Sequence, residues 1–183
     1  MNGFLNAGVS PLKYGFLRIP EYQALSIFLV PSVLLPFIIH SAQFPNQLVV
    51  GTLVNALLAC SALFLTLRSS LPIILLPSLA ALASGIVFGG FTAFLAYLVP
   101  FIWLGNAAYV YALKTLKVAM GVNYFISIAA ASFLKALAIG APSFALISFG
   151  LLPAAFLVPM NLVQFATAFM GGSLAAITRP AWE

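Results

Sequence analysis

Long apolar runs that contain almost no charged residue are the feature that most restricts what this chain can fold into. Only 5% of the 183 residues are charged, whereas 64% are hydrophobic. A soluble domain of this length needs far more charge to cover its water-facing surface. A helix needs about 20 apolar residues to cross a bilayer, and the chain after residue 22 has room for about six such helices. The sequence therefore predicts an all-α polytopic membrane protein, a bundle of six transmembrane helices.

The predicted spans follow one another through short connections and leave no room for a separate soluble domain. Residues 1–22 mix basic and aromatic residues with glycines and prolines, which predicts an interfacial arm on the membrane surface. The membrane domain then covers 23–179, and 180–183 form a C-terminal tail. Prolines in several spans indicate either kinked helices around a cavity or ordinary proline use in membrane helices. The approximate spans are 24–42, 48–67, 72–88, 91–114, 123–148 and 153–177.

The basic residues outside the spans predict how the chain is oriented. With six spans, every basic residue outside them falls on one side of the membrane, and the connections on the other side carry no charge. Because basic residues favour the cytoplasmic side, both termini are expected in the cytoplasm. The formal charge of +5 then favours anionic lipid headgroups at that rim, and no nucleic-acid binding is expected because the basic residues are scattered. These residues are Lys13, Arg18, Arg68, Lys114, Lys117 and Arg179.

Residues that could carry covalent chemistry are scarce. The chain has one cysteine, Cys60, one histidine, His40, and two acids, Glu21 and Glu183. These numbers exclude an intramolecular disulfide, and they exclude an iron–sulfur cluster, a bis-histidine haem, a zinc cluster or a paired-carboxylate site made by this chain alone. We therefore expect no catalytic residue, no metal and no cofactor, and a membrane enzyme is the least favoured function.

Lys135 is the only lysine or arginine predicted in the interior of a span, away from the span ends. It lies 12 residues into the fifth span, or ~18 Å at 1.5 Å per residue, slightly beyond the midplane of a ~30 Å core. A lysine at that depth costs about 2.5–3.5 kcal/mol on insertion and is a functional hypothesis by default. It either contacts a ligand, or it is neutral, bonds helix carbonyls or pairs with another subunit.

Four amide side chains are predicted in the interior of the spans, and three of them share the depth of Lys135. Asn55 lies in span two, and Asn161 and Gln164 lie one turn apart in span six, so that they share a helix face. Asn106 lies nearer the cytoplasm in span four. Buried amides must be paired, either with each other as interhelical contacts or with a ligand.

Three further residues are candidates for contact with a ligand. Trp103 in span four either stacks on a flat ligand or packs against lipid or the bundle core. His40 and Gln43 belong to the most polar predicted outer connection, which could act as a lid over a site, although a lone histidine at a membrane boundary is commonly only interfacial.

Several short segments follow one another along the chain in a recognisable order. They are HSAQ at 40–43, GTLVNALL at 51–58, PSLAAL at 77–82 with Gly85, VPFIWLGN at 99–106, ASFLKA at 131–136, and QFATA at 164–168 with Gly171 and Gly172. Taken together, they resemble the S component of energy-coupling-factor (ECF) vitamin transporters, the substrate-binding membrane subunit, over roughly residues 38–173. The first span departs from the family pattern of small residues four apart, because Ala24 is followed by Phe28.

The resemblance implies a six-helix bundle in the plasma membrane of a prokaryote, with a vitamin-like ligand bound near the outer face. It also implies a coupling membrane subunit and two ATPases as partners. The chain has no G-x-x-x-x-G-K-[ST] loop of its own, so ATP hydrolysis would fall to those partners. The competing hypothesis is a structural or anchoring subunit of a larger membrane complex, for instance a redox complex, in which the buried amides would pack together instead of facing a cavity.

Overall fold

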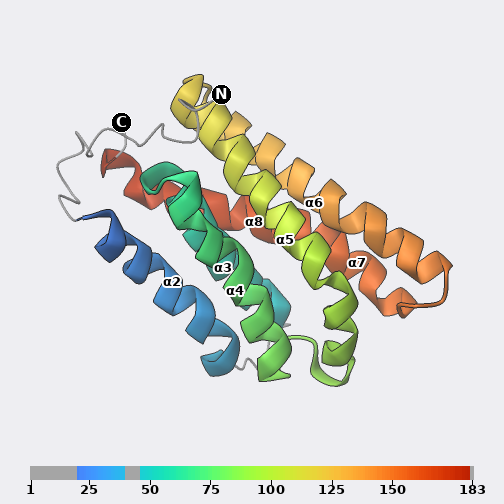
Figure 1. The fold of residues 1–183 in the computed structure, drawn as a ribbon. Coiled ribbons are helices and arrows are strands. Elements are labelled where there is room, and N and C mark those ends of the chain that lie inside the picture. Colours follow the sequence, from blue (N-terminus) through green and yellow to red (C-terminus); the bar gives the residue numbers. More distant parts are fainter. Residues whose placement is uncertain (1–19, 40–45, 182–183) are drawn as a thin grey trace.

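The computed structural model describes residues 20–39 and 46–181 and forms a bundle of helices (Figure 1). Six helical segments are long and apolar enough to cross a membrane, which confirms the predicted all-α bundle and makes the chain a multi-pass membrane protein. His40 and Gln43 lie outside the described residues. The elements are α2 (Glu21–Ile38), α3 (Asn46–Phe64), α4 (Leu67–Ser84), η1 (Gly89–Phe94), α5 (Leu95–Leu113), η2 (Lys114–Ala119), α6 (Tyr124–Ser148), η3 (Ala154–Phe156), α7 (Leu157–Met160), α8 (Leu162–Ala175) and η4 (Ala176–Ala181).

Helix α3 is the central element of the bundle. It contacts α2, α4, α5 and α8. Half of the residues in its 18-residue membrane-spanning segment are buried, compared with 22% in that of α2. Helix α5 packs along α6, and α2 lies against α4 and α3 at one side of the bundle (Figure 1). The residues that could form a site therefore converge on α3 from α5, α6 and α8.

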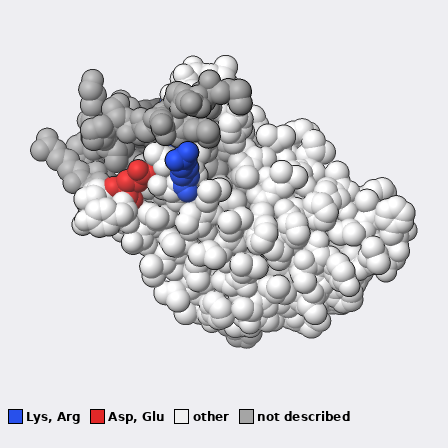
Figure 2. Space-filling model, viewed as in Figure 1, with Lys and Arg blue, Asp and Glu red and all other residues white. Residues whose placement is uncertain are grey.

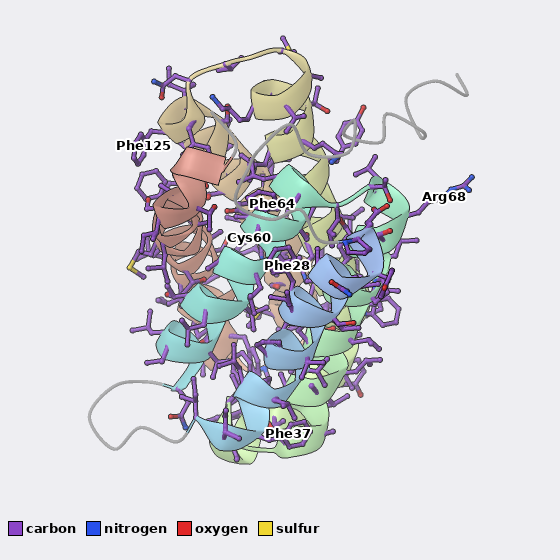
Figure 3. The ribbon with its side chains drawn as sticks, turned by 90° about the vertical axis from the view of Figure 1, so that its left-hand side faces the viewer. Phe28, Phe37, Cys60, Phe64, Arg68 and Phe125 are labelled. Carbon is purple, nitrogen blue, oxygen red and sulfur yellow. The ribbon has the colours of Figure 1, made fainter. Side chains whose placement is uncertain are left out.

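Helix α2 joins the bundle through one narrow stripe. Its buried residues, spaced four apart, are Ala24, Phe28, Ser32 and Pro36. The ring of Phe28 points toward that of Phe64 on α3, with 6.1 Å between the ring centroids (Figure 3). The face of the helix opposite to this stripe is apolar and exposed, as a lipid-facing surface should be. Ala24 and Phe28, the departure from the family pattern, therefore lie on the inward face.

One end of the bundle, which we call the charged end, holds Glu21, Arg68, Lys114 and Lys117. The described residues of the other end, which we call the uncharged end, carry no charge and include the turns at 85–88 and 149–153. In the described part of the face drawn in Figure 2, one red and one blue area lie near the charged end and the rest is white. Figure 3 shows Arg68 pointing away from the bundle.

Two charged side chains fasten the α3–α4 turn at the charged end. The Glu21 carboxylate accepts the backbone N–H of Thr66 at 2.7 Å. Lys114 Nζ donates to the carbonyl oxygens of Ala62 at 3.0 Å and Leu65 at 2.6 Å. The last carbonyls of a helix lack intrahelical partners, so a cation at this position satisfies groups that would otherwise be unpaired. The turn is thus held by α2 on one side and by the end of α5 on the other.

Three predicted spans differ clearly from the observed helices. Span one was predicted at 24–42, but α2 covers Glu21–Ile38. Span three was predicted at 72–88, but α4 covers Leu67–Ser84, because the Thr66 side chain caps its start by accepting the N–H of Ser69 and Gly85 ends it at φ 69°. Span six was predicted as one helix over 153–177, but it is broken at Asn161, whose backbone has φ −115° and ψ −84°. The break separates the four-residue α7 from α8 and changes where the polar residues of this span point.

Candidate functional site

Lys135 lies in the interior of the bundle and is held by two amide oxygens. Its side chain is only 3% exposed. Nζ donates to Oδ1 of Asn55 on α3 at 2.5 Å and to Oδ1 of Asn106 on α5 at 2.6 Å. The ring of Tyr109 lies beside it, with 5.8 Å from Nζ to the ring centroid. The amine is therefore solvated by neutral groups, because both of its acceptors are amide oxygens and none is a carboxylate of the described residues.

The two asparagines extend this contact into a network that reaches five helices. Asn55 Nδ2 donates to Oγ1 of Thr167 on α8 at 3.2 Å. Asn106 Nδ2 donates to the carbonyl oxygen of Ile74 on α4 at 3.0 Å. Each amide thus uses its oxygen for the lysine and its nitrogen for a neighbouring helix. We call Lys135, Asn55, Asn106 and Thr167 the lysine network.

Close helix packing brings the members of the lysine network within reach of one another. A Cβ on Gly105 of α5 would lie 2.6 Å from the Ile139 side chain and 3.2 Å from the carbonyl oxygen of Lys135. A Cβ on Gly171 of α8 would lie 2.5 Å from the carbonyl oxygen of Thr52 and 2.7 Å from Cβ of Asn55 on α3. These glycines allow the backbones to approach as small residues do in membrane helix pairs.

A pocket opens next to the lysine network. Its cavity volume is about 80 Å³, and it is partly open to its surroundings. Lys135, Asn55 and Asn106 lie on its wall, and the other lining residues reach to the uncharged end of the bundle. They are Gln47, Val50, Gly51, Val54, Pro77, Ser78, Ala81, Val87, Phe88, Leu95, Ile102 and Gln164.

Gln164 is the polar lining residue whose side chain has no hydrogen-bond partner among the described residues. It lies in the first turn of α8, three residues after the break at Asn161. Its amide carries both a donor and an acceptor, so it can bond a polar group inside the pocket. The broken helix therefore gives the pocket wall an amide that the bundle itself does not use.

The predicted site residues divide into those that meet at the pocket and those that do not. Lys135, Asn55 and Gln164, which were predicted at a similar depth, all line it, and so does Asn106, which was predicted nearer the cytoplasm. Asn161, expected on the same helix face as Gln164, instead sits at the helix break. There its Nδ2 donates to the Leu157 carbonyl oxygen at 2.8 Å, and its side chain lies against Gly140 of α6.

Trp103 has a position of its own, outside the lining of the pocket. Its indole N–H lies 3.0 Å from the carbonyl oxygen of Leu75 and 2.9 Å from Oγ of Ser78. Of the two interpretations of this residue, stacking on a ligand and packing in the bundle, these bonds favour packing. They also tie the pocket-lining Ser78 to α5.

Three polar residues of the site were not singled out from the sequence. They are Gln47 and Ser78, which line the pocket, and Thr167, which completes the lysine network. Gln47 could have been found from the helical period, because it lies eight residues before Asn55, on the same face of α3. For Ser78 and Thr167 the sequence holds no such signal, since serine and threonine are common in membrane helices and usually bond their own backbone.

Comparison with protein-family models, with curated proteins and with solved structures finds no match to this chain. In the described part of the chain, no three His, Cys, Asp or Glu side chains come together as metal ligands would. The function is therefore argued from the pocket and from the lysine network.

Proposed function

We propose that the chain is the substrate-specific binding subunit of an ECF-type uptake transporter for a vitamin or another small molecule. The observation that carries this proposal is the pocket, whose wall holds a buried lysine and the unpaired amide of Gln164. A buried charge in a membrane helix is costly, and it marks a ligand or ion site more often than a packing site. The ligand would bind in the pocket without covalent chemistry, and ATPases on a separate coupling subunit would drive its release to the cytoplasm.

A specific observation also favours the anchoring alternative. In both Asn55 and Asn106, the side-chain oxygen and the side-chain nitrogen are hydrogen-bonded to other protein groups. Polar side chains that link helices in membrane bundles bond in the same way. In that function the bundle would hold a larger membrane complex, for instance a redox complex, and the pocket would stay filled by lipid or water.

Purification under mild detergent, followed by mass spectrometry of both proteins and small molecules, separates the two functions. For a binding subunit we expect an organic small molecule at a near-stoichiometric amount, together with a coupling membrane subunit or ATPases. Recovery of redox subunits with no small molecule would support the anchoring function instead. The Lys135→Met variant, prepared in parallel, should lose the small molecule while keeping its protein partners.

We propose further that the protein lies in the plasma membrane of a prokaryote with the charged end in the cytoplasm, so that both termini are cytoplasmic and the pocket opens toward the outside. Single cysteines test this orientation in a Cys60→Ala background. Arg68 is exposed at the charged end and Gly90 is exposed at the uncharged end, with no atom within 4 Å of a Cβ built there. A membrane-impermeant thiol reagent should label Gly90→Cys in intact cells and Arg68→Cys only after permeabilisation; the reverse pattern would invert the topology.

A further inference from the structure

The polar groups that line the pocket are mostly engaged already, which limits what a ligand can bond. Gln47 donates to the carbonyl oxygen of Pro159, and Ser78 donates to that of Leu75. Asn55 and Asn106 are engaged at both ends within the lysine network. An ammonium has three N–H donors, and Lys135 uses two of them on the asparagines. The principal polar contacts left for a ligand are therefore one N–H of Lys135 and the amide of Gln164.

No carboxylate in the described part of the chain balances an ammonium at Lys135. The sequence contains two acids, of which Glu21 is the first residue of α2 at the charged end and Glu183 lies at the end of the chain, outside the described residues. Two neutral amide oxygens solvate an ammonium but do not cancel its charge. A buried cation without a counter-ion is costly, and an anion placed in the pocket would remove that cost.

The remainder of the lining is apolar and comes from α3, α4, α5 and the turn before η1. Such a lining stabilises a ligand through the apolar area that it removes from water. A second negative charge, or an amine, would find no opposite charge in this lining and would have to be desolvated without compensation. The apolar side chains that form most of it are Val50, Val54, Ala81, Val87, Phe88, Leu95 and Ile102.

We infer that the pocket takes a small amphipathic monoanion, with one carboxylate on Lys135, an apolar body along α3, α4 and α5, and a polar group for Gln164. This inference rests on the proposed binding function and names the chemical class of its ligand. Asn55 and Asn106 are then positioning residues, because both ends of each amide are engaged by the protein and their oxygens hold the ammonium in place.

A matched series of eight-carbon probes tests the inference on the purified full-length protein in a neutral detergent. The probes are octanoate, octanamide, octane-1,8-dioate and octylammonium. Binding can be followed by calorimetry and by the fluorescence of Trp103 in a Trp182→Phe background, because the Trp103 indole is bonded to the pocket-lining Ser78. We expect saturable binding of octanoate, at least tenfold tighter than that of the other three probes.

The variants assign any octanoate binding to the pocket. Lys135→Met should raise the Kd for octanoate ten- to a hundredfold, as expected for a lost hydrogen bond to a charged group, while leaving weak octanamide binding unchanged. Arg68→Met removes the same charge at the exposed surface of the charged end and should change nothing. The ranking of the probes on the unmodified protein needs no variant and stands even if Lys135→Met does not fold.

Two outcomes would overturn the inference. The first is octanoate binding that Lys135→Met leaves unaltered, and the second is an unmodified protein that prefers the diacid, the ammonium or the amide, or that binds none of the four. The proposed function would survive these results if a small molecule of another class co-purified with the protein and was lost in Gln164→Leu. The proposed function and the inference would both be wrong only if no small molecule of any class bound or co-purified.

Discussion

Replacement of both Asn55 and Asn106 by leucine is expected to destabilise the folded protein by about 3–5 kcal/mol, the cost of leaving a buried charge without its partners. The Lys135 side chain would stay in a site that is 3% exposed but would lose both oxygens that accept from it. The effect should be visible as a lower midpoint in unfolding by sodium dodecyl sulfate, followed by the loss of helical circular dichroism.

The triple variant with Lys135→Met added distinguishes the loss of charge solvation from the mere loss of packing. An apolar replacement of a complete buried ionic group is often neutral or stabilising, so most of the lost stability should return when the lysine is removed as well. Ser132→Ala is the matched control, because Ser132 is fully buried one turn from Lys135 and its hydroxyl has no hydrogen-bond partner. A triple variant as unstable as the double variant would show that the asparagines act by packing alone.

The fold could be predicted from the sequence because the membrane reduces the choice of structures to a few. Apolar runs of about 20 residues must be helices, since a spanning segment has to satisfy its backbone hydrogen bonds internally. The length of chain available predicted six spans and the placement of the basic residues agreed with that number, which the described helices confirm. The ends of the helices were harder to predict than their number. Helix α4, for example, begins after Thr66 and ends at Gly85, and hydropathy averaged over many residues does not reveal such single-residue signals.

The candidate site could be predicted only in part. The depth of a residue in the membrane follows from its position along the span, but the direction in which its side chain faces depends on how the helix is rotated about its axis, which the sequence does not give. Lys135, Asn55 and Gln164 were predicted at a similar depth, and all three line the pocket. Asn161 and Trp103 lie at suitable depths as well but bond backbone carbonyls away from the pocket. Which partner a side chain reaches depends on how the helices rotate and where one of them breaks, and neither property follows from hydropathy.

The lysine network shows that the same amide side chains can both link helices and take part in a ligand site, which the sequence presented as alternatives. The sequence offered amides that either hold helices together or meet a ligand. In the folded bundle Asn55 and Asn106 do hold helices together, and by doing so they fix the ammonium of Lys135 at the pocket wall. A site built on rigid elements in this way is preorganised, so a ligand need not order the side chains that it meets.

Introduction of valine at Gly171 should therefore damage both the packing and the site. The Cβ would lie 2.5 Å from the carbonyl oxygen of Thr52 and 2.7 Å from the backbone nitrogen of Ala56, so that the conflict is with the backbone of α3 and no side-chain rotation relieves it. Helices α3 and α8 would have to separate. That movement would carry Asn55 away from Thr167 and disturb the oxygen that accepts from Lys135.

We expect Gly171→Val to cost about 3 kcal/mol of stability, the upper part of the usual range for overpacking, and to weaken octanoate binding in any protein that remains folded. Gly90→Val is the control, because the space around Gly90 is open and an exposed substitution of this kind should change stability by no more than about 0.5 kcal/mol. Gly171→Ala should fall between the two, since it brings the same Cβ into conflict but adds no further methyl groups. Equal stability of Gly171→Val and Gly90→Val would mean that α3 and α8 do not approach closely at this glycine, and the positioning of Lys135 through Asn55 would then need another explanation.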